Sequence, residues 1–219
     1  MKKIAAILVL IVTMAFQLPE KPVRIFMIGD STMANKPLED NPERGWGQYF
    51  SQYLTNDVEV KNYAVNGRST KSFIKEGRWD TVMNQIQAGD FVIIQFGHND
   101  SKVEDSTRYA APQTTYRENL IRFINDARSK GANPILVTPV MRRKFDATGK
   151  FVDQHGEYPG VVKDVAAKLN VPLIDLHKSS QALIEKEGVE NSKRFFLNIP
   201  PNHFKNYKGK AEDNTHFSE

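Results

Sequence analysis

The sequence predicts an α/β protein, a three-layer α/β/α sandwich built on a five-stranded parallel sheet. Apolar runs of strand length alternate with helical patterns along most of the chain. The runs are nearly continuous in their apolar character, as expected for strands that are covered on both faces. Alternating strands and helices favour a parallel sheet with helices on each side. A length of 219 residues suits one domain with a full hydrophobic core.

The expected elements follow one another without a repeat or a low-complexity linker. Five strands are expected over residues 23–30, 58–65, 91–97, 134–140 and 171–177. Five helices are expected over residues 45–54, 80–87, 114–131, 158–170 and 179–188. After residue 194 the sequence is rich in proline, glycine and polar residues and has no clear period. A long irregular segment in a compact domain usually serves the function, so we expect a functional loop there.

The composition excludes several kinds of site. The chain contains no cysteine, which excludes disulfides, zinc–thiolate centres and cysteine nucleophiles. Its formal charge is only +4, and its basic residues are interspersed with acidic ones. This pattern does not predict nucleic acid as a partner.

The N-terminus has the pattern of an export signal. The basic start "MKK" precedes an apolar run of thirteen residues, "IAAILVLIVTMAF", which is too short to span a bilayer comfortably. We expect a signal peptide over residues 1–15, a short segment over 16–22 and the folded domain over 23–219. We therefore expect the protein to be secreted or periplasmic and not to be stably inserted in the membrane after the signal peptide is cleaved. A buried first strand or an uncleaved anchor is the alternative.

Polar residues gather where the predicted strands end. "GDST" (29–32) follows the first strand, "NGR" (66–68) the second, "GHND" (97–100) the third and "MRR" (141–143) the fourth, while "DNTH" (213–216) lies in the terminal loop. In open α/β sheets, ligands bind beyond the carboxyl ends of the strands. We therefore expect these residues to share one edge of the sheet.

These residue types suit acyl transfer. A serine hydroxyl becomes nucleophilic when a neutral histidine removes its proton, which gives Ser31 and His216 as a candidate pair. A carboxylate on the other ring nitrogen fixes the tautomer, a role that Asp213 fits. The developing oxyanion needs preorganised donors. The backbone N–H groups of Ser31 and Gly67 and the side-chain amide of Asn99 are the expected set.

In this order, the blocks "GDST", "NGRST", "GHND" and "DNTH" resemble those of the SGNH (GDSL-type) hydrolase superfamily. "RGWGQ", "GRWD", "TPVMRRKFD" and "DNTHFSE" resemble its rhamnogalacturonan acetylesterase branch. The resemblance implies a flavodoxin-like sheet and removal of acetyl groups from acetylated pectin through an acetyl-enzyme intermediate. It implies Ser31, His216 and Asp213 as the triad, an oxyanion hole of Ser31, Gly67 and Asn99, and no metal or organic cofactor.

Three arginines and two aromatic residues are candidates for substrate contact. Arg68, Arg142 and Arg143 follow strand ends, where guanidinium groups could pair with uronate carboxylates of an acetylated polysaccharide or oligosaccharide. Trp46 and Tyr158 could stack on sugar rings, or they could simply belong to the core.

Other interpretations stay open at this point. Asp30 at the end of the first strand could suggest phosphoryl transfer, although Thr32 stands where such sites want a second aspartate. A lipolytic esterase would use the same triad, and a carbohydrate-binding protein with impaired catalysis would retain the fold.

The remaining polar residues near the blocks have simpler expected roles. We expect His98 to back up the site, Asp100 to brace its loop, and His177 to be structural or to line the cleft. His155 and His203 are expected in solvent.

Members of the resembled family continue past the D-x-x-H-F block into a final helix. Phe217, Ser218 and Glu219 are therefore expected to begin that helix, and the domain to be truncated at its C-terminus. On this interpretation His216 lies near a fraying end with few contacts. An apolar strip of the sheet is expected to stay exposed.

Overall fold

The computed structural model describes residues 22–205 and 208–219. The predicted signal peptide, residues 1–15, and nearly all of the segment 16–22 lie outside these residues, so export stays a prediction. Within the described ranges, the structure contains no helix with the length and apolarity needed to cross a bilayer.

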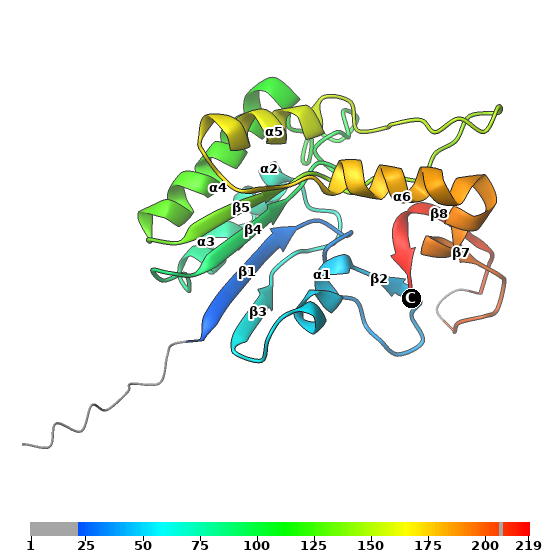
Figure 1. Cartoon of the computed structure of the whole chain (residues 1–219), viewed down its shortest axis with the longest axis horizontal. Helices are drawn as coiled ribbons and strands as arrows, with labels where there is room; N and C mark the ends of the chain where they lie inside the picture. The colour runs from blue at the N-terminus through cyan, green and yellow to red at the C-terminus, as the bar shows by residue number, and fades with distance from the viewer. Residues whose placement is uncertain (1–21, 206–207) are drawn as a thin grey trace, which may run out of the picture.

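The main sheet has the predicted five strands, and all of them are parallel (Figure 1). Their order is β3-β1-β4-β5-β6. The strands are β1 (Val23–Gly29), β3 (Val58–Asn62), β4 (Phe91–Gln95), β5 (Asn133–Val137) and β6 (Leu173–Ile174). Each ends before its predicted C-terminal boundary, because the last predicted residues turn out of the ladder and form the loops of the carboxyl edge.

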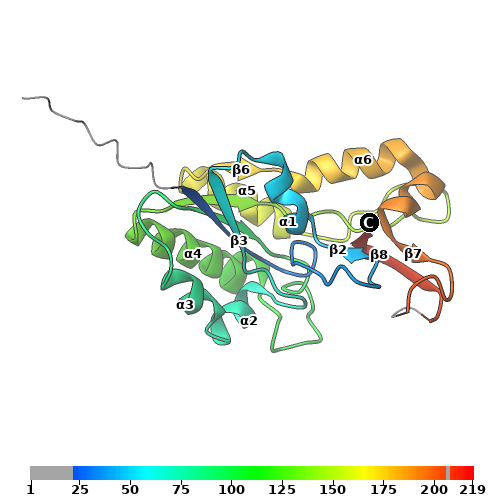
Figure 2. The same ribbon diagram turned by 90° about the horizontal axis from the view of Figure 1, so that it is seen from below.

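Helices cover both faces of this sheet, which confirms the three layers (Figure 2). Phe26 and Ile28 of β1 pack on one side, and Met27 packs on the other. The first side carries α2 (Thr70–Lys75), α3 (Arg78–Met83), α4 (Arg117–Ser129) and α5 (Tyr158–Lys168). The second side carries α1 (Trp46–Tyr49), the 3-10 helix η1 (Phe50–Tyr53) and the start of α6 (Leu176–Asn191).

The helix boundaries differ from the predicted ones in ways that local chemistry explains. The predicted helix 45–54 is divided between α1 and η1, and α4 is preceded by the π-helical turn η2 (Pro112–Tyr116). Helix α2 was not predicted from periodicity. Its signal was the capping box, in which the Ser69 side chain accepts from the Ser72 N–H and the Ser72 side chain bonds back to Ser69.

A second, antiparallel sheet corrects two expectations about the C-terminal region. Strands β2 (Glu43–Arg44), β8 (Ala211–Ser218) and β7 (Phe196–Ile199) pair in that order, and η3 (Ser192–Phe195) leads into β7. The segment after residue 194 is therefore not simply irregular. Phe217 and Ser218 continue a strand and do not start a helix, since Phe217 pairs with Arg44 on one side and with Phe196 on the other.

The same pairing anchors the segment that carries His216. Phe217 packs against Phe196 with ring centroids 5.6 Å apart, and Arg44 forms an ion pair with Glu219 (2.8 Å). The expected fraying of His216 is thus wrong for this fold.

Candidate active site

Ser31 stands on a tight turn directly after β1. The carbonyl of Asp30 accepts hydrogen bonds from the N–H groups of Met33 (3.2 Å) and Ala34 (3.1 Å). The Asp30 carboxylate accepts from the N–H (2.9 Å) and the hydroxyl (2.8 Å) of Thr32. The fully buried carboxylate also contacts His98 Nδ1 at 3.1 Å. With one carboxylate oxygen bonded inside the turn and the other in contact with His98, Asp30 is a structural residue, which removes the phosphoryl-transfer interpretation.

Two glycines let α1 pack closely on this turn. A Cβ atom on Gly45 would lie 2.1 Å from the Ala34 carbonyl oxygen, and one on Gly47 would lie 2.6 Å from the Met33 carbonyl oxygen. Trp46 between them donates its N–H to the Thr32 carbonyl (2.9 Å) and its indole N–H to Gln95 (2.6 Å). Trp46 therefore packs against the Ser31 turn and stabilises it, in agreement with the alternative that Trp46 belongs to the core.

A bulge in β8 builds the acid–histidine pair. Opposite β7, Phe217 pairs with Phe196 and Glu212 with Asn198, so residues 213–216 bulge from the ladder opposite a single residue. Within the bulge the Asp213 carboxylate accepts from the N–H groups of Thr215 (2.7 Å) and His216 (3.1 Å). The four residues thus form a local turn that the strand pairing holds at both ends.

The bulge brings the three predicted catalytic side chains into one line. Asp213 Oδ2 lies 2.6 Å from His216 Nδ1, and His216 Nε2 lies 2.8 Å from Ser31 Oγ. Burial by itself would raise the pKa of Asp213, but hydrogen bonds from His216 and Thr215 outweigh it and lower the pKa to about 2. An ionised Asp213 accepts Nδ1–H, which leaves Nε2 free to accept the Ser31 hydroxyl proton.

The predicted oxyanion donors lie at the same edge. Gly67 and Asn99 line the cavity that contains Ser31 and His216. In the part of the chain that the structure describes, the N–H groups of Ser31 and Gly67 donate to no protein acceptor. Asn99 uses one amide N–H to donate to the Arg68 carbonyl (3.1 Å) and has a second one. Gly67 has a φ of +76°, and a Cβ atom there would meet only Arg108 Nη1 at 3.8 Å, an ordinary contact, so the glycine is explained by this backbone conformation more than by a close approach.

Arg143 has a different place from the predicted one. It is only 7% exposed and donates to Ser192 Oγ (2.9 Å), to Asn214 Oδ1 (2.8 Å) and to the Val189 carbonyl. Its own N–H also donates to the Asn214 carbonyl (2.8 Å). Arg143 therefore ties the β8 bulge to the end of α6 and does not line the cavity.

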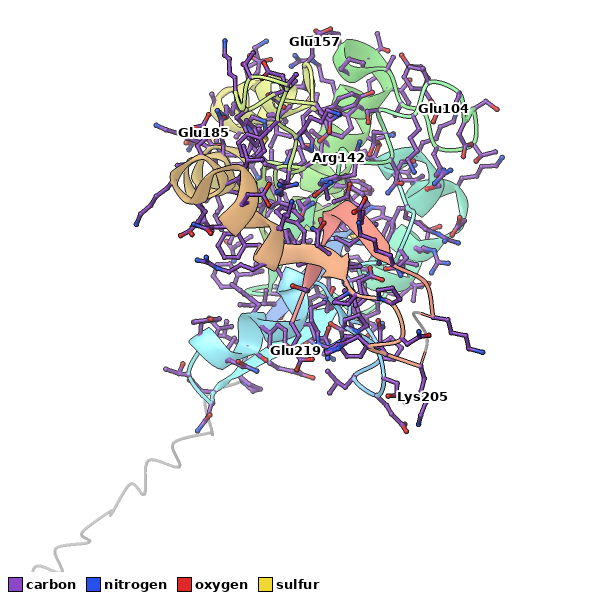
Figure 3. All side chains as sticks on the ribbon, turned by 90° about the vertical axis from the view of Figure 1, so that its right-hand side faces the viewer. Glu104, Arg142, Glu157, Glu185, Lys205 and Glu219 are labelled. Carbon is purple, nitrogen blue, oxygen red and sulfur yellow. The ribbon has the colours of Figure 1, made fainter. Side chains whose placement is uncertain are left out.

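The cavity beside Ser31 has a volume of about 440 Å³ and a basic lining. Arg142 lies on it as predicted, and Figure 3 looks onto this end of the molecule and labels that residue. Lys102 and Arg108 also line it and were missed by the sequence reasoning, although both follow the "GHND" block within a few residues. Arg68 lies on an adjoining cavity that shares Gly67 and Arg108. Burial and the neighbouring charges of Arg108 and Arg142 lower the pKa of Lys102.

A second cavity, of about 520 Å³, holds none of the predicted catalytic side chains. It lies between α6, β7 and β8 and is lined mainly by apolar residues, among them Leu183, Ile184, Phe195 and Phe217.

The other candidates separate into core and support. Tyr158 is buried and donates its hydroxyl to the carbonyls of Asp100 and Ala110 (both 2.9 Å), so it does not face a sugar. Asp100 braces its loop as predicted, accepting from the Thr70 N–H (2.9 Å). His155 was expected in solvent but is 4% exposed, with its Nε2 atom 3.3 Å from His98 Nε2. His98 also lines the cavity that contains Ser31.

Comparisons with known proteins agree with this geometry. The family model described as "GDSL-like Lipase/Acylhydrolase family" matches residues 27–218. The chain belongs to this family. Rhamnogalacturonan acetylesterase RhgT of Bacillus subtilis (strain 168) is 44% identical over 200 residues, 91% of this chain and 84% of the relative. The rhamnogalacturonan acetylesterase of Emericella nidulans is 30% identical over 193 residues, covering 80% of this chain and 75% of the relative.

Solved structures of other proteins share the fold. Protein YXIM from Bacillus subtilis superposes with a TM-score of 0.75 at 24% identity, covering 90% of this chain and 51% of that protein, about half its length. The acetylxylan esterase Axe2 from Geobacillus stearothermophilus gives a TM-score of 0.57 at 18% identity, over 75% of this chain and 82% of that one. The three-layer architecture is confirmed, and this GDSL-like chain is an ester-hydrolysing enzyme.

Proposed function

We propose that this GDSL-like chain is a serine acetylesterase that removes acetyl groups from acetylated rhamnogalacturonan with Ser31, His216 and Asp213 as its triad. The observation that carries the proposal is the line of hydrogen-bond contacts from Asp213 through His216 to Ser31, at 2.6 Å and 2.8 Å. In this arrangement Asp213 orients His216, and His216 can accept the proton of the Ser31 hydroxyl.

The steps follow from the donors and acceptors in place. His216 Nε2 takes the Ser31 proton as Oγ attacks the acetyl carbonyl, and Asp213 stabilises the imidazolium. The N–H groups of Ser31 and Gly67 and the Asn99 amide receive the oxyanion. The imidazolium then protonates the sugar oxygen as its bond to the acetyl carbon breaks, so the sugar leaves with a free hydroxyl and acetyl-Ser31 remains. Water deprotonated by His216 attacks this ester, and collapse of the second intermediate releases acetate and restores the Ser31 hydroxyl.

Two features support an acidic polysaccharide as substrate. Two relatives that cover most of this chain are named rhamnogalacturonan acetylesterases. The cavity lining is basic. Arg108 is paired with Asp105 (2.5 Å), whereas Lys102 and Arg142 form none of the ion pairs found in the described ranges, so both can meet a uronate carboxylate. A lipolytic esterase would need an apolar acyl site beside Ser31. The apolar cavity instead lies at α6, β7 and β8, and Ser31 is not on it.

The deciding experiment measures acetate released from acetylated rhamnogalacturonan by the chain and by Ser31→Ala. We expect release by the unaltered chain and a loss of at least about 1000-fold in the variant. A small activated acetyl ester serves as a second substrate. Serine-dependent cleavage of that ester without release from the polysaccharide would reject the substrate and keep the triad. A folded chain that cleaves neither would reject the esterase, leaving the carbohydrate-binding alternative.

We also propose that the chain is exported through its N-terminal segment, on the basis of "MKK" and the apolar run that follows. Expression of the full chain in a secreting bacterial host and intact-mass measurement of the exported product test this. A product that retains Met1 and stays in the cytoplasm would contradict it.

A further inference from the structure

Three side chains outside the proposed catalytic set meet where the loop before α5 reaches the start of α6. They are Asp153, His155 and His177. His155 Nδ1 lies 3.4 Å from Asp153 Oδ1, and His177 Nε2 lies 3.1 Å from Asp153 Oδ2. One ligand atom from each residue can be chosen so that all lie within 4.8 Å of one another. The two histidines are 4% and 9% exposed, whereas the Asp153 side chain, at 41%, is open to solvent.

Both histidine nitrogens in this cluster are buried without a hydrogen bond. His155 Nδ1 and His177 Nε2 have no partner of acceptable geometry among the residues that the structure describes. Buried polar atoms are nearly always satisfied, because leaving one unpaired costs the hydrogen bonds that it would make with water. Here two such atoms face the same carboxylate, so a shared partner would satisfy them together.

The number of protons available to the neighbouring side chains also indicates that a cation is missing at His155 Nδ1. Asp30, His98, His155 and Asp153 make three successive contacts, at 3.1, 3.3 and 3.4 Å. Each contact needs one proton, but two neutral imidazoles supply only two. If His98 donates Nδ1–H to Asp30, its Nε2 atom accepts from His155 Nε2–H. The lone pair on His155 Nδ1 then faces the Asp153 carboxylate at 3.4 Å, an arrangement that a cation between them, either a metal ion or a third proton, would stabilise.

We propose that Asp153, His155 and His177 bind one divalent transition-metal ion of the Zn²⁺ class. Two imidazole nitrogens and one carboxylate are ligands that such ions prefer. Bonds of about 2.0–2.2 Å in a tetrahedron place neighbouring ligand atoms about 3.3–3.6 Å apart. One ligand atom from each residue lies within 4.8 Å of the other two, so the side chains would close on the ion by at most about 1.5 Å. The fourth position would be open to water on the exposed side of Asp153. The positive charge of Arg142 acts on His155 and opposes the ion, and Asp153 offsets it.

The ion would fasten a long loop to the helix beside it. Residues 142–157 run out over α6 before the chain turns back into α5 (Figure 1). Asp153 and His155 lie on the returning part of this loop, and His177 lies in the first turn of α6. The metal would also fix the His155 tautomer that donates to His98, whose other nitrogen contacts Asp30 beneath the Ser31 turn. Its part is positioning, separate from ester hydrolysis.

The test uses the chain without a histidine tag, stripped of metal by a chelator, and measures Zn²⁺ by equilibrium dialysis. We expect one ion per chain, with affinity reduced at least about tenfold in Asp153→Asn and in His177→Gln. His203→Gln serves as the matched control, since His203 is exposed and outside the cluster. His216→Gln removes the histidine–carboxylate pair of the proposed triad and should leave this binding in place.

A second measurement does not depend on how the variants fold. In the unaltered chain labelled with ¹⁵N-histidine, Zn²⁺ should shift the imidazole resonances of His155 and His177 and leave those of His203 unchanged. Absence of binding would overturn the proposal and assign the missing cation to a proton. Binding that survives both cluster substitutions, or that disappears with His216→Gln, would also overturn it.

Discussion

At the scale of single residues, the site depends on which nitrogen of His216 carries the proton. Asp213 holds that proton on Nδ1 through a contact of 2.6 Å. In Asp213→Asn the amide can donate to Nδ1 and so favours the wrong tautomer. We expect kcat to fall about 1000- to 10,000-fold with stability little changed, as measured with an activated acetyl ester. Asp146→Asn is the control, because exposed Asp146 makes a similar local turn with Thr148. Equal losses in both variants would contradict the tautomer argument.

Asp100 gives a second residue-scale prediction, on pH. Complete burial raises its pKa to about 7, against donated bonds from Thr70 that lower it. Because the folded pKa lies above the unfolded value, the folded state holds the proton more tightly. This contribution to stability is full below about pH 4 and is lost as pH rises toward about 7, by about 1.4 kcal/mol per unit. Urea unfolding at several pH values should show this slope, and Asp100→Asn should remove it. Parallel curves for the two proteins would refute the assignment.

At the scale of elements, the β8 bulge is the feature that completes the site. Arg143 holds it through Asn214, by one backbone and one side-chain hydrogen bond. In Arg143→Met, His216 should lose its fixed position relative to Ser31. We expect kcat to fall about 10- to 100-fold and the free energy of unfolding to fall by about 1–3 kcal/mol.

Arg128→Met is the matched control for that variant. Arg128 donates to the Leu169 and Asn170 carbonyls at the end of α5, away from the cavity. The Arg128→Met variant should lose some stability while its kcat stays unchanged. If Arg143→Met lost stability alone, the positioning role would be wrong.

The elements also show what sequence could and could not predict. Local patterns sufficed to predict the five parallel strands. They also sufficed to predict that Ser31, Gly67, Asn99 and the Asp213–His216 pair would come together, because each block follows a strand or makes its own turn. The pairing of β7 with β8 has no such local pattern, since four bulged residues break the period of β8. The burial of Arg143 depends on Asn214, 71 residues away, and that of His155 on His98, 57 residues away. Contacts of this range follow from packing and not from spacing.

At the scale of the whole molecule, the sheet order places the site. The order reverses at β1, so the chain leaves β1 and β4 toward opposite sides and a crevice opens at their carboxyl ends. Ser31 follows β1 and Asn99 follows β4 at this crevice, and β8 supplies His216 from the second sheet. Although the net charge is only +4, basic residues are gathered at the same place. We therefore expect the positive potential of these clustered side chains, more than the net charge of the protein, to attract an acidic substrate.

This field gives the last prediction. The double variant Lys102→Gln, Arg108→Gln removes two cavity charges, and we expect KM for acetylated rhamnogalacturonan to rise about tenfold at low salt. Added salt should raise KM for the unaltered chain toward that of the variant, because exposed charges are screened over about 10 Å at 0.1 M. A small neutral acetyl ester should show neither effect. Lys130→Gln with Lys186→Gln, both exposed and away from the cavity, is the charge-matched control. If KM for the neutral ester rose equally, the charges would act on Ser31 and its oxyanion donors and not on the uronate backbone.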